Sequence, residues 1–212
     1  MKTGLLFDLD GTLLDTLEDL MDSTNYILAQ NGYPPRSRQE IRAFVGNGAR
    51  NLLLKAAPAG ADVDALLAQF QPYYAAHCQI KTKPYPGVEE AVAALRKEYP
   101  IAIVSNKPDN AVKTLCAQLF PGISAVGERS DCPRKPAPDM VWRAMEELGV
   151  DRCVYIGDSE VDVLTAKNAD VPCVSVLWGF RDWEEIEAAG GSIFCERAEA
   201  LPGIIGGLCN GQ

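Results

Sequence analysis

The spacing of hydrophobic positions changes along the chain. A short apolar segment at 4–9 is followed by a long stretch, 15 to about 81, in which apolar residues recur at helical spacing. One such stripe consists of Leu17, Leu20, Met21, Ile27 and Leu28. From about Pro84 onward, short apolar runs alternate with amphipathic segments. The pattern therefore predicts one strand, then a block of helices, then alternating strands and helices.

Punctuating residues divide the helical block. Asp15 with Glu18, and Ser37 with Glu40, have the spacing of capping boxes, which satisfy backbone donors at a helix start. Gly32 is expected to end the first helix, and a Gly-Asn-Gly sequence at 46–48 to end the second. Two further helices are expected over roughly 49–57 and 62–78.

The second part of the chain predicts a parallel sheet. Strands are expected at 101–105, 124–127, 153–157 and 173–177, separated by helices at roughly 87–98, 108–119, 137–148 and 160–169. Such alternation is typical of a doubly wound, Rossmann-like α/β core with helices on both faces. The strand at 4–9 belongs to that sheet, so 15–81 is predicted to be an all-helical cap inserted into a core made of 1–14 and 82–212. The glycine-rich tail, about 199–212, is expected to fray.

Composition narrows the function classes. The 212 residues carry a net charge of -9 with a pI near 4.7, which argues against a nucleic-acid partner. Seven cysteines without a Cys-x-x-Cys spacing, and no targeting pattern, indicate reduced thiols and a cytoplasmic location. No apolar run is long enough to span a membrane. The chain has one histidine, His77, so a Ser-His-Asp triad has little support. Both a monomer and a homodimer remain open.

Polar residues gather where the predicted strands end, which is where ligands bind in this architecture. The first strand runs into Asp8 and Asp10, whose i, i+2 spacing predicts two carboxylates side by side on one face. The later strand ends and loops contribute Ser105, Asn106, Lys135, Asp158, Ser159 and Asp162. Each is typical of a turn, a helix cap or a solvated side chain when taken singly. Their joint occurrence at strand ends indicates a site.

These residue types suit phosphoryl transfer. Carboxylate oxygens are natural Mg²⁺ ligands, and an aspartate can attack phosphorus as a nucleophile. A second carboxylic acid can protonate the leaving oxygen and then activate water. A lysine, a serine hydroxyl and backbone amides can bind the charged oxygens of the transferring group.

The set Asp8-Leu-Asp-Gly-Thr12, Ser105-Asn106, Lys135 and Gly157-Asp-Ser-x-x-Asp162 resembles the four motifs of the haloacid dehalogenase superfamily. The insert after the first motif resembles the helical cap of its first subclass. The resemblance implies that Asp8 is the nucleophile and Asp10 the general acid/base. It further implies the following roles: phosphoryl or substrate binding by Gly11, Thr12, Ser105, Asn106 and Lys135; Mg²⁺ ligation by Asp8, the carbonyl of Asp10, and Asp158; and support by Ser159 and Asp162.

Finer similarity favours a phosphatase of small phosphorylated metabolites. Asp10 favours phosphate monoesters over carbon–halogen bonds, and several segments resemble the phosphoglycolate phosphatases of the superfamily, which implies 2-phosphoglycolate as substrate. They include Phe44-Val-Gly-Asn-Gly-Ala-Arg50, in which Asn47, Gly48 and Arg50 are expected to bind the part of the substrate away from phosphate. Arg181 is a second candidate. The alternatives are a phosphomutase of the β-phosphoglucomutase type, a phosphatase acting broadly on sugar phosphates, and a non-enzymatic binding protein.

Overall fold

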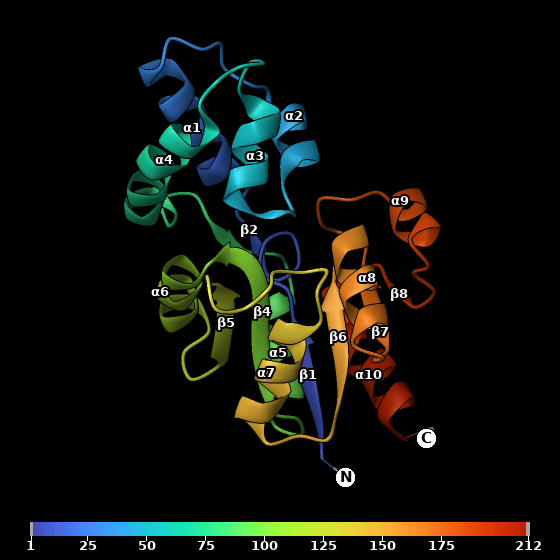
Figure 1. Cartoon of the computed structure of the whole chain (residues 1–212). Helices are drawn as coiled ribbons and strands as arrows, with labels where there is room; N and C mark the ends of the chain where they lie inside the picture. The colour runs from blue at the N-terminus through green and yellow to red at the C-terminus, as the bar shows by residue number, and fades with distance from the viewer. Residues whose placement is uncertain (1, 211–212) are drawn as a thin grey trace.

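A six-stranded parallel sheet forms the centre of the computed structural model, which describes residues 2–210 (Figure 1). Its strands lie in the order β5-β4-β1-β6-β7-β8, and every neighbouring pair is parallel. Their bounds are β1 Thr3–Phe7, β4 Ile101–Pro108, β5 Ser124–Glu128, β6 Arg152–Gly157, β7 Cys173–Val176 and β8 Phe194–Cys195. Successive strands are added on one side of β1 and then on the other, so the crevice at β1 is the topological switch point. The predicted fold class is confirmed.

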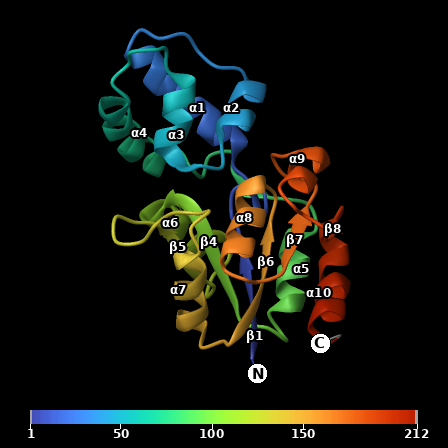
Figure 2. The same cartoon turned by 45° about the vertical axis from the view of Figure 1, so that its right-hand side comes forward.

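Alternation along the strands divides the core between the two faces of the sheet. Leu5 and Phe7 of β1 belong to one apolar cluster and Leu6 to another, because successive strand side chains point to opposite faces. One face is covered by α5 (Val88–Leu95), α6 (Asp109–Leu119) and α10 (Leu201–Asn210), and the other by α7 (Asp139–Leu148) and α8 (Glu160–Asn168) (Figures 1 and 2). With both faces buried, the loops at the strand ends remain as the place for a site.

Four helices lie beyond the carboxyl ends of the strands (Figure 1). They are α1 (Leu17–Gln30), α2 (Arg38–Phe44), α3 (Gly48–Ala56) and α4 (Val63–His77). The two connections to the core pair with each other as a short antiparallel ribbon, β2 (Leu14–Asp15) and β3 (Lys83–Pro84). These helices therefore form a group directly above the switch point.

One of the two predicted capping boxes is correct. Ser37 caps α2, and its side chain and backbone both bond to Glu40. The predicted box at Asp15 is wrong. The α1 helix begins after Thr16, and Glu18 instead forms an ion pair with Arg38 at 2.8 Å. A partner distant in sequence thus outcompetes the local cap.

The prediction that the C-terminal tail frays is wrong for the described residues 201–210. They form α10, whose Leu201 and Ile205 are buried at the spacing of one helical turn. Burial of this face against α5 offsets the poor helix propensity of its glycines. A short helix α9 (Trp183–Ala188), a one-turn 3₁₀ helix (Ala198–Ala200) and β8 were not predicted. Within residues 2–210, no helix combines the length and apolarity needed to cross a bilayer.

Candidate active site

The loop after β1 turns back on itself directly beyond the strand. The Asp8 amide still bonds to the Ile156 carbonyl of β6 at 2.8 Å, and the chain then turns at Gly11, whose φ is 88°. A Cβ at Gly11 would collide with the carboxylate of Asp158, so glycine is required here both for the turn and for the close approach. Thr12 donates its hydroxyl to Asp158 Oδ1 at 2.8 Å. Gly11 and Thr12, predicted to bind phosphate, thus shape the position of Asp158.

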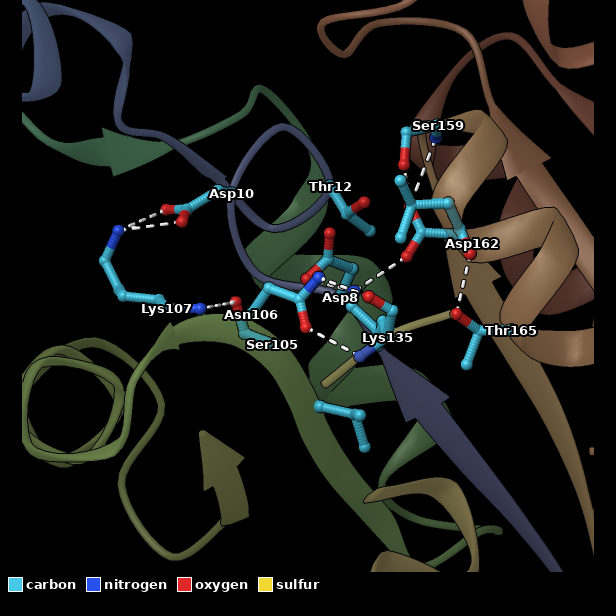
Figure 3. Close-up of polar contacts among 12 residues, drawn as sticks. Asp8, Asp10, Thr12, Ser105, Asn106, Lys107, Lys135, Ser159, Asp162 and Thr165 are labelled. Atoms are coloured by element: carbon cyan, nitrogen blue, oxygen red, sulfur yellow. Dashed lines mark hydrogen bonds and ion pairs between the residues drawn. The ribbon is translucent and has the colours of Figure 1, made fainter. Parts of the chain in front are cut away.

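Lys135 is the cation at the centre of the site. Its side chain is 2 % exposed, and its Nζ lies 2.9 Å from Asp8 Oδ1 and 2.8 Å from Asp162 Oδ1 (Figure 3). The ammonium also donates to the Tyr155 hydroxyl at 3.0 Å, and this hydroxyl donates to a β4 carbonyl. Burial opposes the charged form, but the two carboxylates outweigh it and hold the pKa of Lys135 well above its usual value. Lys135 therefore stays charged beside Asp8.

Three buried carboxylates surround this one ammonium. Oxygens of Asp8, Asp158 and Asp162 all lie within 4.8 Å of one another. Burial raises the pKa of Asp8 to about 7 against the opposing effect of Lys135. Burial, and then the charges of Asp162 and Asp8, raise the pKa of Asp158 well above its usual value. Three carboxylates against one ammonium leave an excess of negative charge that a divalent cation would neutralise.

The three acids differ in how much of their hydrogen-bonding capacity is used. Asp162 accepts from the amides of Asp158 and Ser159, from the Ser159 hydroxyl at 2.6 Å, and from Lys135. Asp8 Oδ1, although close to Lys135, receives no aligned hydrogen bond from the described residues. Asp158 keeps lone pairs beside its two bonds, from Thr12 and the Phe180 amide. Asp8 and Asp158 thus fit the donor set of a hard cation, and Asp162 fits a supporting role.

Asp10 does not lie side by side with Asp8 as predicted. The strand ends at Phe7, so strand alternation no longer governs the two aspartates. Both Asp10 oxygens bond to Lys107 Nζ at 2.7 Å, and Figure 3 shows this pair on the side of the site away from Lys135. Lys107 was not singled out from the sequence. A lysine inside a strand that is otherwise buried was the feature that could have identified it.

Asn106, predicted to bind substrate, is occupied by backbone partners. Its amide donates to the Lys135 carbonyl at 3.0 Å and accepts from the Lys135 amide at 2.8 Å. The same side chain donates to the Gly46 carbonyl of the helical group at 3.1 Å. Asn106 thus positions Lys135 and ties the helical group to β4, while Ser105 beside it is buried with its hydroxyl near the Lys107 amide.

A cavity lies between the strand ends and the helical group. Its core lining is formed by Asp8, Asp10, Ser105, Asn106, Lys107 and Pro108, and its upper lining by Leu20, Val45, Gly46, Gly48, Ala49, Leu52, Phe70 and Tyr74. The polar side is thus the core, and the apolar side comes mainly from the helices. A small molecule with one strongly charged end fits this division.

Of the residues predicted to read the substrate, Gly48 lines the cavity, but Asn47 and Arg50 do not. Arg50 forms an ion pair with Asp64 at 2.9 Å, and its side chain is 51 % exposed. The reason is geometric. Two residues along a helix correspond to a rotation of about 200°, so Arg50 points away from the face that Gly48 presents.

Arg181 is also committed elsewhere. Its guanidinium donates to the carbonyls of Val45 at 2.6 Å and Arg42 at 3.0 Å, and pairs with Glu160 at 2.9 Å. Arg181 is buried and links the loop after β7 to the helical group. It thus acts as a clamp between the two parts rather than as a substrate ligand.

Known proteins share this sequence and architecture. The sequence model of the family described as haloacid dehalogenase-like hydrolase matches residues 5–176. A phosphoglycolate phosphatase of Rhodobacter capsulatus is 36% identical over 219 residues, covering 98% of both chains. An N-acetylmuramic acid 6-phosphate phosphatase of Pseudomonas aeruginosa is 33% identical, covering 89% of this chain and 88% of the relative. A crystal structure of a candidate phosphoglycolate phosphatase from Lactobacillus delbrueckii subsp. bulgaricus is 39% identical with a TM-score of 0.87, covering 95% of this chain and 97% of the other.

Proposed function

We propose, from the premise that this chain belongs to the haloacid dehalogenase-like hydrolases, that it hydrolyses a small phosphomonoester that carries a carboxylate, with 2-phosphoglycolate the first candidate. Its enzyme class is phosphoric monoester hydrolase. The observation that carries the proposal is the Asp8 carboxylate. It lies 2.9 Å from a buried lysine at the switch point and lines the cavity under the helical group.

Asp8 is the proposed nucleophile. Its carboxylate oxygen attacks phosphorus, an Asp8 O–P bond forms, and the bond from phosphorus to the ester oxygen breaks. The leaving oxygen takes a proton from Asp10. Water then attacks the aspartyl phosphate at phosphorus and gives its proton to Asp10, which releases phosphate and regenerates the Asp8 carboxylate.

Lys135 and Ser105 are the proposed ligands of the transferring phosphoryl oxygens. Lys135 is held between Asp8 and Asp162, so its ammonium is already oriented before substrate binds. Asp162 and Ser159 keep that arrangement rigid through their mutual hydrogen bonds. Little reorganisation is then needed during the reaction.

Mg²⁺ is the proposed cofactor. Asp8, the carbonyl of Asp10, and Asp158 would hold it, and when bound it would neutralise charge on the phosphoryl group. The excess negative charge of the three buried acids supports a divalent cation at this place. Asp8 must be ionised to attack phosphorus, and a nearby cation favours that form.

The division of the chain into a core (1–14 and 82–212) and a cap (15–81) stays part of the proposal. The ribbon of β2 and β3 supports it, because both connections between the two parts run through this pair. A cap that closes over the cavity would exclude water from the developing charge.

A second substrate is a sugar phosphate. The similarity to an N-acetylmuramic acid 6-phosphate phosphatase favours it. A phosphomutase would use the same core residues, and it differs in retaining the phosphoryl group rather than passing it to water.

Phosphate release from a panel of esters with Mg²⁺ tests the proposal. The panel holds 2-phosphoglycolate, glucose 6-phosphate and β-glucose 1-phosphate, with Asp8→Asn as the inactive variant and Asp22→Asn, at an exposed position, as its matched control. We expect 2-phosphoglycolate to be hydrolysed best, Asp8→Asn to abolish release and Asp22→Asn to retain it. Preference for glucose 6-phosphate would replace the substrate. Conversion of β-glucose 1-phosphate into its 6-phosphate isomer would establish the mutase, and no Mg²⁺-dependent activity on any ester would refute the proposal.

A further inference from the structure

We propose that Lys107 and Tyr74 form a subsite for the substrate carboxylate across the seam between β4 and α4, and that its occupation frees Asp10 for proton transfer. This inference rests on the proposed phosphatase function and adds to it the residues that select a carboxylated substrate.

Lys107 is a buried cation whose present partner belongs to the reaction. Its side chain is 2 % exposed and lines the cavity, and its Nζ bonds to both oxygens of Asp10 at 2.7 Å. Burial disfavours its charged form, but the Asp10 carboxylate outweighs this and raises the pKa of Lys107 above its usual value. While Asp10 stays in this bidentate contact, it points away from Asp8, where a leaving oxygen would need its proton (Figure 3).

Tyr74 approaches the same ammonium from the helical group. Its ring centroid lies 4.8 Å from Lys107 Nζ, and its ring stacks on Phe70. Tyr74 is 2 % exposed and lines the cavity, yet its hydroxyl makes no aligned hydrogen bond to any described residue. Burial raises the pKa of this hydroxyl, so it keeps its proton and remains a donor. An unused buried donor beside a cation is the chemistry of an anion site.

Other cations near the cavity are already engaged or directed elsewhere. Lys135 is held by Asp8 and Asp162, Arg50 is paired with Asp64, and Arg181 is bonded to backbone carbonyls. Among the described residues that line the cavity, Lys107 is the one with a positive charge. A second negative group of the substrate therefore has Lys107 as its partner.

The spacing along β4 agrees with a short substrate. Ser105, the proposed phosphoryl ligand, precedes Lys107 by two residues, which is about 7 Å along a strand and on the same face. A carboxylate one carbon beyond the ester oxygen reaches from one to the other. When that carboxylate takes the ammonium of Lys107, Asp10 loses its partner and can turn toward the ester oxygen.

The test compares two esters that differ in one group. In ethyl phosphate a methyl group replaces the carboxylate of 2-phosphoglycolate, so the ratio of their kcat/KM values isolates recognition of the carboxylate. Tyr74→Phe removes one oxygen and keeps the stacking, and we expect it to lower the ratio about tenfold or more. Lys107→Met should lower the ratio about 100-fold. It should do so through 2-phosphoglycolate, while ethyl phosphate turnover is retained or rises because Asp10 is no longer held.

The matched control is Tyr26→Phe, which removes the hydroxyl of an exposed, stacked tyrosine on α1 and should leave the ratio unchanged. Equal losses on both esters in Tyr74→Phe and Lys107→Met would overturn the subsite, because they would indicate a general structural role. Absence of Mg²⁺-dependent turnover on any ester in the unmodified protein would instead overturn the proposed function.

A binding measurement keeps the subsite testable without turnover. The inhibition constants of 3-phosphonopropionate and propylphosphonate form the same comparison, since these compounds have a methylene in place of the ester oxygen. We expect the carboxylated compound to bind more tightly to the unmodified protein and to lose that advantage in Tyr74→Phe. Equal inhibition constants in the unmodified protein would refute the subsite.

Discussion

Replacing Lys135 by methionine should destabilise the protein strongly, and only while no divalent cation is bound. Lys135 is the ammonium that faces three buried carboxylates, at 2.9 Å from Asp8 and 2.8 Å from Asp162. At an effective dielectric constant of about 20, each of these two contacts corresponds to about 6 kcal/mol of Coulomb attraction. Relief of the desolvation of the ammonium offsets much of this, and removal of one partner from a buried network costs about 3–5 kcal/mol net.

Urea unfolding in EDTA at pH 8 measures this cost. With an m-value of about 3 kcal/mol/M, the midpoint should fall by about 1–1.5 M. The loss should shrink at pH 5, because the folded variant can protonate its acids, and the pKa of Asp8 is already raised to about 7 by burial. Between an unfolded pKa near 4 and a folded pKa near 7 or above, the folded state binds more protons, so stability falls as the pH rises through this range. Saturating Mg²⁺ should restore much of the midpoint at pH 8.

Lys81→Met is the matched control. Lys81 also forms a short ion pair, with Asp22 at 2.6 Å, but both side chains are 49% exposed. Solvent screens such a pair, so the midpoint should change little and should not depend on EDTA. If Lys135→Met shifted the midpoint no more than Lys81→Met at pH 8 in EDTA, the electrostatic account of the site would be refuted. If Mg²⁺ gave no recovery, the cation would not lie at these carboxylates.

Three further predictions concern the same site. The apparent affinity for Mg²⁺, followed by titration calorimetry, should weaken as the pH falls through about 7, because burial raises the pKa of Asp8 and protons then compete with the cation; an affinity that is flat from pH 5 to 8 would contradict this. Arg181→Met should lower the free energy of unfolding by about 2 kcal/mol and speed hydrogen exchange at residues 42–49, since two buried carbonyls lose their donor; unchanged exchange there would exclude the clamp. Gly179→Ala should weaken Mg²⁺ binding about tenfold or more, because the added Cβ collides with the side chain of Asp158, and an unaltered affinity would remove Asp158 from the ligand set.

Much of the site could be predicted because strand ends in a parallel sheet share one edge. Asp8, Ser105 and Asp158 follow three neighbouring strands, so the order of elements was enough to bring them together. Asp162 lies one turn into α8, and its contact with Lys135 agrees with the supporting role expected for it. Their individual catalytic roles remain predictions.

Orientation within the helical group could not be predicted in the same way. Arg50 was expected in the cavity because of its position after a glycine-rich turn, but the rotation of α3 directs it to Asp64. The pairing of Asp10 with Lys107 was missed because a salt bridge between residues 97 apart leaves no local pattern. Tyr74 was missed for a related reason, since an aromatic residue in an amphipathic helix is typical of a core position.

Hydrophobic periodicity and the polar residues at the strand ends were sufficient to derive the α/β sheet, the inserted helices and the acid-rich centre. Periodicity records which faces are buried, and chain order records which strand ends meet. Side-chain direction and partner choice were decided only by the tertiary structure. A buried ammonium is stable only where carboxylates from distant segments surround it, and the sequence does not order those segments in space. For this reason the unused hydroxyl of Tyr74 and the partner of Asp10 become visible only in the folded chain.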